Sequence, residues 1–295
     1  MQRISCSVPQ GSILGPLLFL IYVNDMDNVS KLLHFILFAD DTNILYSNAD
    51  FRSLINIVNS ELISLSDWFK VNRLSINLKK THLIYFGYKS IPPESDIYEN
   101  KLRIDQEIIS EVDHTKFLGV FIDKKVTWLQ HVNYISIKIA KSLCVLSKLK
   151  YKLPKQCLLT LYYSLIYPHL NYCIVMWGSA AKTVLLKLVL LQKRAVRLID
   201  NVYYLSHSDP IFKKYSILNI NSLYKLSCLL FTYKIKNNHI PNVGIDLVLL
   251  NNNSASAYSL RTIDNFIVPN HRTTLRSKCI NVKRTKILEV NSRFV

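Results

Sequence analysis

The sequence predicts an α+β fold, with short strands and helices in its first part and helices alone behind Trp128. In the first part, apolar residues come in short runs separated by turn residues, whereas after Trp128 they recur every three or four positions. Of the 295 residues 49% are hydrophobic and only 6 are glycine, which favours a packed core over a disordered or glycine-rich all-β chain.

The first elements surround a pair of adjacent acids. Residues 11–26 form a turn followed by an apolar run, in which Pro16 suits the first turn of a helix. In residues 34–47, two apolar runs flank Asp40 and Asp41. This pattern predicts a tight β-hairpin that carries the two acids at or near its turn.

An amphipathic helix and several short strands follow. The helix covers residues 50–69, with Asn48 or Asp50 as its cap and with Leu54, Ile57, Val58, Leu62, Leu65 and Phe69 as its apolar stripe. Short strands are expected at residues 82–86, 102–104, 107–109 and 116–122, with Asp105 and Gln106 as a hairpin turn between the second and the third. The alternation of strands and helix gives the α+β layout.

Behind Trp128 the pattern is helical. One apolar stripe consists of Val132, Ile135, Ile139, Leu143 and Leu146, and Lys138, Lys141 and Lys148 fall on other faces of the same helix. Further helices are expected to begin at Pro154 and to cover residues 183–199 and 219–236, and residues 251–257 are expected to form an exposed loop.

An uncharged stretch at residues 158–177 is long enough to span a bilayer. It carries Pro168, His169 and Asn171 near its centre, and polar groups there are costly in hydrocarbon. We therefore expect a buried helix, a break and a second buried segment, and no association with a membrane.

The charge is strongly positive and uneven. Lys and Arg number 37 against 20 Asp and Glu, a net charge of +17. Residues 124–199 contain thirteen basic residues and no acidic one. Such a balance points to a polyanionic partner, either a nucleic acid or an acidic membrane surface.

The six cysteines show no C-x-x-C pair, so neither structural zinc nor a disulfide framework is expected. Residues 1–10 lack the apolar core of a signal peptide. We expect an intracellular protein, in the nucleus or the cytoplasm.

The adjacent acids Asp40 and Asp41 are the sharpest chemical feature. Two carboxylates this close repel each other unless a cation or hydrogen-bond donors compensate them, and Mg²⁺ is bound by one or two carboxylates together with substrate phosphates. On the dipeptide alone, turn and capping chemistry is the favoured interpretation. Of the other candidates, Asp25 and Asp27 fit surface positions, and His131 and His169 fit packing positions better than ligand positions.

The order of further motifs resembles the reverse transcriptases of non-LTR retrotransposons. Residues 8–19 (VPQGSILGPLLF) with residues 21–25 (IYVND) are similar to motif B of that family, and residues 38–41 (FADD) to its motif C. Similarity to motif D lies in Trp68, Asn72, Leu74, Ser75, Asn77, Lys80 and Thr81, and similarity to motif E lies in residues 117–120 (FLGV) with Trp128 and His131. Residues 161–162, 177–178 and 192–195 are also similar to the family's later segments.

The resemblance implies roles for several residues. Asp40 and Asp41 would be the catalytic metal site for Mg²⁺, with Asp41 the less essential of the two. Gln10 and Gly11 would border the incoming nucleotide and the template, and Lys80 would lie near the nucleotide's phosphates. Phe117, Leu118 and Gly119 would grip the primer end. The partners implied are an RNA template, a DNA primer and deoxynucleoside triphosphates.

Independently of the family, the basic helices suit contacts with a phosphate backbone, for which Lys138, Lys141 and Lys148 are the candidates. Solvated lysine faces are the alternative.

The resemblance also implies a domain organisation. Residues 1–125 would be a partial polymerase palm, a β-hairpin and short antiparallel strands with helices. Residues 126–240 would be an all-helical, basic thumb, and residues 241–295 a basic segment that ends without an evident closing element.

The family's motif A aspartate has no counterpart, because no acidic residue precedes Gln10. Since two-metal nucleotidyl transfer needs carboxylates from more than one strand, we expect this polypeptide alone to be inactive. The alternative is a non-catalytic nucleic-acid-binding remnant that uses the basic thumb.

Overall fold

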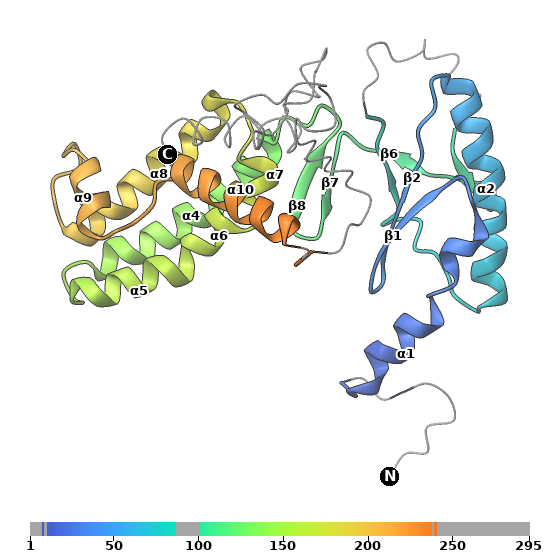
Figure 1. The fold of residues 1–295 in the computed structure, drawn as a ribbon, viewed down its shortest axis with the longest axis horizontal. Helices are drawn as coiled ribbons and strands as arrows, with labels where there is room; N and C mark the ends of the chain where they lie inside the picture. Colours follow the sequence, from blue (N-terminus) through green and yellow to red (C-terminus); the bar gives the residue numbers. More distant parts are fainter. Residues whose placement is uncertain (1–7, 9–10, 87–100, 238, 241–295) are drawn as a thin grey trace, which may run out of the picture. The chain divides into compact units, whose positions relative to one another are not determined.

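The computed structural model describes residues 8, 11–86, 101–237, 239 and 240, and the chain divides into two compact units, Met1–Asp113 and His114–Val295 (Figure 1). We call them the first and the second unit. The β7–β8 hairpin introduced below belongs to the second unit, so the units do not divide at residue 125. The functional domains at 1–125, 126–240 and 241–295 stay predictions. Gln10, the predicted loop at 251–257 and the whole basic segment 241–295 lie outside the described residues.

The first unit begins with a helix, a hairpin and a long helix. Its described elements are α1 (Leu14–Tyr22), η1 (Met26–Val29), β1 (His34–Phe38), β2 (Asp41–Leu45), α2 (Phe51–Val71), β3 (His82–Leu83), β4 (Arg103–Ile104), β5 (Glu107–Ile108) and β6 (Ser110–Glu111). The strands form two-stranded sheets: β1 with β2 and β4 with β5 are antiparallel, and β3 with β6 is parallel. The predicted turn at Asp105 and Gln106 is confirmed, with φ of 49° and 71°.

Helix α2 supplies more buried residues to the core of the first unit than any other element. The Asp50 carboxylate caps it by accepting a hydrogen bond of 2.7 Å from the backbone N–H of Ser53. Of the predicted stripe, Val58, Leu62 and Leu65 are buried. The prediction missed Ile55, which is completely buried, and the predicted members Leu54, Ile57 and Phe69 are only half-buried.

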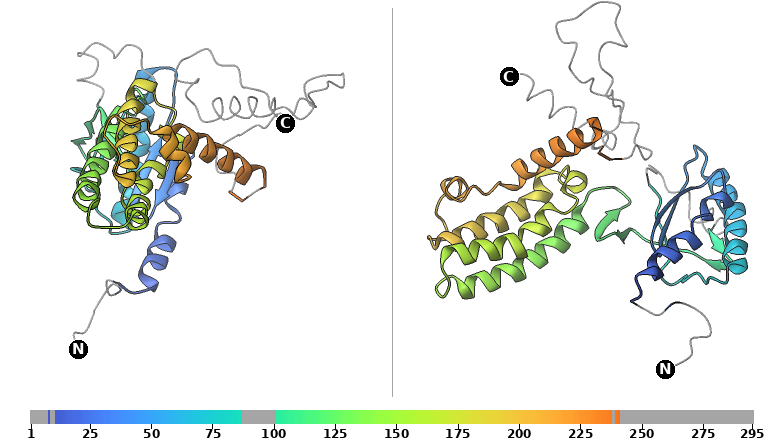
Figure 2. Two further views of the ribbon diagram at one scale, coloured as in Figure 1. Left: turned by 90° about the vertical axis from the view of Figure 1, so that its left-hand side faces the viewer. Right: turned by 60° about the horizontal axis from the view of Figure 1, so that its bottom comes forward.

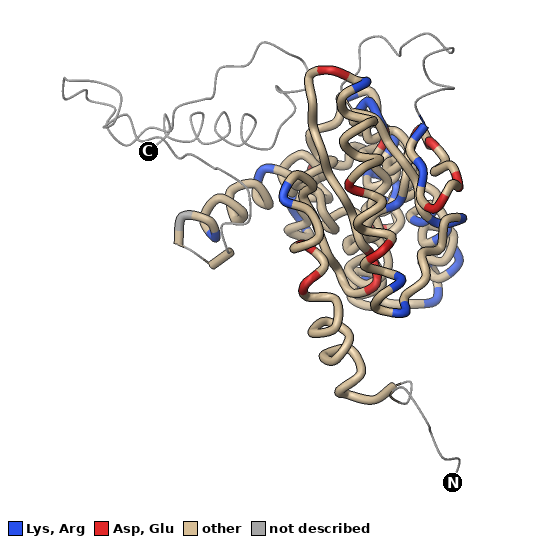
Figure 3. Tube along the Cα trace, turned by 90° about the vertical axis from the view of Figure 1, so that its right-hand side faces the viewer, with Lys and Arg blue, Asp and Glu red and all other residues tan. Residues whose placement is uncertain are grey.

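Helix α1 contributes little to this core. Its nine residues include no charged residue (Figure 3). None of the nine is buried. Pro16 lies in its first turn, as predicted. An apolar helix thus leaves most of its surface exposed in the structure.

The second unit is a hairpin followed by helices. Its described elements are β7 (His114–Phe117), β8 (Val120–Asp123), α4 (Leu129–Leu149), α5 (Lys155–Leu165), α6 (Tyr167–Asn171), α7 (Ile174–Trp177), α8 (Lys182–Asp200), α9 (Asp209–Lys214) and α10 (Ile220–Lys236). Figure 2 shows α4, α5 and α8 running side by side. The single strand predicted at residues 116–122 is wrong, since a turn divides this stretch between β7 and β8.

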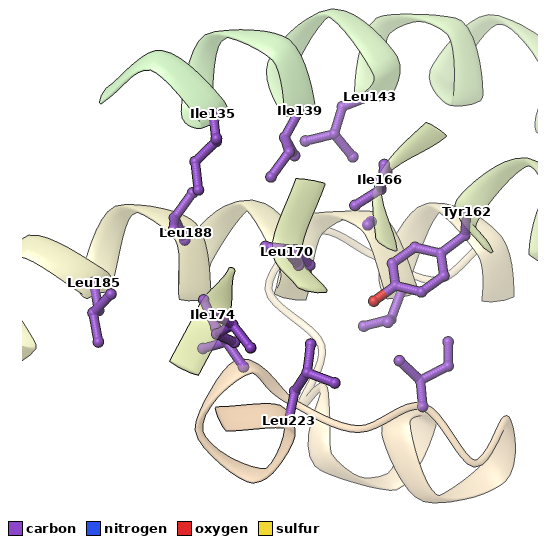
Figure 4. Close-up of a cluster of buried hydrophobic side chains, with 14 of the residues drawn as sticks. Ile135, Ile139, Leu143, Tyr162, Ile166, Leu170, Ile174, Leu185, Leu188 and Leu223 are labelled. Carbon is purple, nitrogen blue, oxygen red and sulfur yellow. The ribbon is translucent and has the colours of Figure 1, made fainter. Parts of the chain in front are cut away.

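The helices enclose one continuous core. The predicted stripe of α4 is confirmed, because Val132, Ile135, Ile139, Leu143 and Leu146 are all buried. Figure 4 shows Ile135 and Ile139 pointing toward α8, with Leu170 and Ile174 from the short helices α6 and α7 packed below.

The uncharged stretch at residues 158–177 forms most of α5, then α6 and α7, which matches the predicted helix, break and second buried segment. Within the described part of the chain, no helix has the length and apolar character needed to cross a membrane.

Candidate functional site

The two adjacent acids lie at the tip of the β1–β2 hairpin. Phe38 pairs with Asp41 across the turn, so Ala39 and Asp40 form the turn and Asp41 begins β2. Ala39 adopts a φ of 51°, a left-handed conformation that lets a two-residue turn close the hairpin. Both carboxylates are exposed. The prediction of a hairpin with the acids at its turn is confirmed.

The base of this hairpin is held by the core. Phe35 and Leu37 of β1 and Ile44 of β2 pack against the buried residues of the first unit. The hydroxyl of Thr42 donates to the sulfur of Met26, at 3.9 Å, which ties β2 to η1. One face of the hairpin is therefore anchored in the core, and the two acids at its tip are exposed to solvent.

The donor set at the tip fits part of a magnesium shell. Carboxylate oxygens are the hard ligands that Mg²⁺ prefers, and the ion keeps several positions for water and substrate phosphates. Among the described residues, no group of three or more His, Cys, Asp or Glu side chains is placed to hold a metal. Asp25 and Asp27, which flank Met26, are exposed and do not complete such a group.

The other predicted residues of the first unit have separate positions. Lys80 is exposed in the turn before β3, where its backbone N–H donates to the carbonyl of Asn77 at 2.9 Å. Gly11 has a φ of 85°, which disfavours any side chain, and open space where a Cβ would point. No contact joins Lys80 to Asp40 or Asp41 within the described part of the chain.

The predicted primer grip is the turn between β7 and β8. Leu118 and Gly119 both have positive φ, 44° and 84°, as the two central residues of a type I′ hairpin turn. The hydroxyl of Tyr172, which follows α6, donates to the carbonyl of Leu118 at 2.7 Å. The turn is therefore held in a defined conformation by a residue 54 positions later in the chain.

The three predicted backbone-binding lysines all lie on α4. Lys141 and Lys148 are exposed, and Lys138 is half-buried beside Tyr134. Sequence reasoning missed Tyr134, whose ring lies against Lys138, and Lys116 on β7, which contacts the same ring. Hydrogen bonding to Lys138, and to a lesser extent to Lys116, lowers the pKa of Tyr134.

The side chains of His131 and Tyr162 are packed in the core of the second unit. His131 is 2% exposed, its ring packs against Trp177, and burial lowers its pKa to about 4. Burial and the charge of Lys138 lower the pKa of His169. Tyr162 is completely buried, and its hydroxyl accepts a hydrogen bond of 2.9 Å from Gln192.

Comparison with known proteins gives consistent matches. Residues 2–122 match the family described as reverse transcriptase (RNA-dependent DNA polymerase). The chain is 28% identical over 226 residues to the probable RNA-directed DNA polymerase from transposon X-element of Drosophila melanogaster, covering 74% of this chain and 24% of that protein. It is 26% identical over 223 residues to the RNA-directed DNA polymerase from mobile element jockey of the same species, covering 71% and 23%.

A third relative is the retrovirus-related Pol polyprotein from type-1 retrotransposable element R1 2 of Nasonia vitripennis, 22% identical over 179 residues, covering 59% of this chain and 44% of that protein. The chain spans about a quarter of the length of the Drosophila relatives. No solved structure matches it significantly.

Proposed function

The chain is related to the reverse transcriptases of non-LTR retrotransposons, and we propose that it supplies part of the metal site and the nucleic-acid grip of an RNA-directed DNA polymerase. The observation that carries the proposal is the placement of Asp40 and Asp41 at the exposed tip of a hairpin whose base is anchored in a core. In this proposal residues 1–125, which include the β7–β8 hairpin, are part of the polymerase palm, and residues 126–240 are the thumb.

Each residue then has a defined task. Asp40 and Asp41 would hold Mg²⁺, which when bound stabilises the charge that develops on the reacting phosphate oxygens. Lys80 would contact the phosphates of the incoming nucleotide, and Gln10 and Gly11 would border that nucleotide and the template. The Leu118–Gly119 turn would position the primer end, supported by its bond to Tyr172.

The 295 residues alone are proposed to lack polymerase activity. Two-metal transfer requires carboxylates from more than one strand, and among the described residues no third His, Cys, Asp or Glu is placed to complete a metal site with the pair on the β1–β2 hairpin. Primer extension on an RNA template with Mg²⁺ tests this. We expect no extension, together with binding of the primer–template that weakens steeply with salt.

Extension that disappears in Asp40→Ala would contradict the proposed inactivity and would support the metal role of Asp40 directly. Asp25→Ala is the matched control, because Asp25 is also exposed and lies in the same unit. Binding of Mn²⁺, as a paramagnetic probe of the magnesium site, should weaken in Asp40→Asn and stay unchanged in Asp25→Asn. Equal Mn²⁺ binding by both variants would exclude the hairpin as the metal site.

The second candidate is a nucleic-acid-binding protein without chemistry. The stretch of residues 124–199, which has no acidic residue, favours it. This alternative predicts salt-sensitive binding of nucleic acid that depends neither on Mg²⁺ nor on Asp40. A dependence of primer–template binding on Mg²⁺ that Asp40→Ala removes would rule it out.

A further inference from the structure

Two lysines from different elements converge on one tyrosine in the second unit. Lys116 lies on β7, whereas Tyr134 and Lys138 lie one turn apart on α4. The Nζ atoms of Lys116 and Lys138 lie 5.3 and 4.7 Å from the centre of the Tyr134 ring. Lys116 also donates a hydrogen bond of 3.5 Å to the Tyr134 hydroxyl. Two positive charges are thus gathered around a single phenol.

The Tyr134 ring beside these two lysines is held in place by its neighbours. Phe121 of β8 packs edge-on against Tyr134, with ring centres 5.0 Å apart, and the ring centre of His114 lies 6.0 Å from that of Phe121. The backbone N–H of Phe121 donates to the ring of buried His131 at 3.4 Å. The hairpin and the helix therefore place both lysines against the same fixed ring.

No carboxylate neutralises Lys116 or Lys138 among the described residues. Two other lysines of the same unit are neutralised by one carboxylate, because Asp200 forms ion pairs with Lys155 at 3.0 Å and with Lys214 at 2.7 Å. The acid at the end of β8, Asp123, accepts hydrogen bonds from Thr127 and from the backbone of Trp128 instead. Like charges that share a site repel each other, and a bound anion removes that repulsion.

We propose that Lys116, Tyr134 and Lys138 form a phosphate clamp, in which the two ammonium groups and the phenol hydroxyl hold one phosphate of a nucleic-acid backbone. The clamp rests on the proposed function, and it names three residues through which the second unit would bind the nucleic-acid backbone. The two charged ammonium groups and the neutral phenol hydroxyl would each donate a hydrogen bond to the same phosphate group.

A backbone phosphate fits the surroundings better than a free phosphate ion. Lys141 and Lys148 continue from Lys138 along α4, and both are exposed. Lys148 follows Lys138 by ten positions, which corresponds to about 15 Å of helix. An extended polyanion can contact all three positions, whereas a free phosphate can occupy only one of them.

The test measures binding of a labelled primer–template by the full chain at several salt concentrations. The variants are Lys116→Gln, Lys138→Gln, the double variant and Tyr134→Phe. The control is Lys225→Gln, which removes an exposed lysine from α10. We expect the double variant to bind about tenfold more weakly. Its slope of log affinity against log salt should fall by about 0.9, the value for one duplex phosphate.

The single variants and Tyr134→Phe sharpen this expectation. If the lysines share one phosphate, each single variant already shows most of the loss of affinity that the double variant shows. The two single losses are then not additive. Tyr134→Phe keeps the ring packed on Phe121 and should weaken binding about threefold through the lost hydroxyl. Since it leaves the packing unchanged, it tests the clamp even if a lysine variant folds poorly.

Three results would overturn the clamp. One is a double variant that binds like Lys225→Gln. Another is a slope that falls by about 1.8 with additive single effects, which would mean two separate phosphates. The third is calorimetric binding of inorganic phosphate that depends on both lysines while primer–template affinity does not, which would assign the site to a free anion.

Failure of the clamp and failure of the proposed function give different results. A full chain that does not bind the primer–template at all contradicts both. Retained binding that Lys141→Gln and Lys148→Gln weaken, but the clamp variants do not, contradicts the clamp alone.

Discussion

The two units bury their apolar residues to very different extents. In the second unit, the helices surround a core in which Tyr162, Leu170 and Trp177 are completely buried. In the first unit, α1 has no buried residue, and Ile36 and Phe38 on the outer face of the β1–β2 hairpin are exposed. The helices of the second unit thus enclose a continuous core, although Leu186, Leu190 and other apolar side chains on their outer faces are exposed. In the first unit, a whole apolar helix and the outer face of the hairpin that carries the acids are uncovered. Large exposed apolar patches mark surfaces that bind other structures or that cause aggregation.

The largest effect is expected in the core of the second unit. Trp177→Ala removes a completely buried side chain that also donates a hydrogen bond of 2.8 Å to the carbonyl of Tyr172. Loss of such a side chain costs about 3–5 kcal/mol of unfolding free energy, measured by denaturant unfolding followed by helical circular dichroism. Leu186→Ala on α8 is the control, because Leu186 is exposed and should change stability very little. Equal effects of the two variants would mean that the helical core is not the stable part of the molecule.

The second prediction concerns pH, through His131. Burial lowers its pKa to about 4, below the value of 6.5 in the unfolded chain, so the unfolded state binds a proton that the folded state does not. The stability of the second unit is therefore complete above pH 6.5 and falls as the pH drops toward about 4, by about 2–3 kcal/mol. In His131→Gln this dependence should be flatter over the same range. Parallel pH profiles for the two proteins would contradict a buried, neutral histidine.

The same contrast explains which elements sequence reasoning could predict. The α4 stripe was predicted correctly because a helix with one fully buried face shows its period in the sequence. The residue pattern predicted a single strand across the β7–β8 turn because Leu118 and Gly119 lie inside an apolar run, in which Gly119 is the only residue typical of a turn. Its conformation depends on the bond to Tyr172, a contact between distant parts of the chain. In α2, burial of Ile55 in place of Leu54 depends on how the helix packs, which its period alone does not fix.

In the candidate sites too, sequence reasoning found residues that are close in sequence and missed those that only the fold brings together. The acids were found because Asp40 and Asp41 are adjacent and lie between apolar runs, a pattern that is local in sequence. Lys116 and Tyr134 were missed because they are 18 residues apart, on a strand and a helix, and only the fold brings them together. Local sequence patterns thus reveal sites built on one turn, whereas sites built between two elements require the structure.

The third prediction addresses the hairpin turn at Gly119. Gly119→Ala places a side chain at a φ of 84°, with its Cβ 3.4 Å from the ring of Tyr172. The strain should cost about 1 kcal/mol of unfolding free energy. Gly15→Ala in α1 is the matched control, since the glycine there is helical and a Cβ would meet only ordinary contacts. That substitution should not destabilise the chain, and a larger loss at Gly15 than at Gly119 would contradict the assigned turn.

The smallest effect on stability, and the clearest on solubility, is expected at α1. Leu14, Leu17 and Ile21 are 60%, 54% and 65% exposed, so replacing all three by Gln should change the unfolding free energy by less than about 0.5 kcal/mol per site. The wild-type chain should aggregate at physiological salt, and the triple variant should raise the fraction that stays in solution after centrifugation.

Leu186 and Leu190 of α8 provide the comparison from the second unit. Both are exposed to a similar degree, but they lie on a helix that also carries Lys182, Lys187 and Lys193. Their replacement by Gln should raise solubility less, because apolar residues interspersed with charges do not form a continuous patch. If both sets of substitutions act equally, or if the wild-type chain is a soluble monomer, the uncovered surface of the first unit is not what governs association. If only the α1 set acts, α1 is the surface through which the first unit meets another structure.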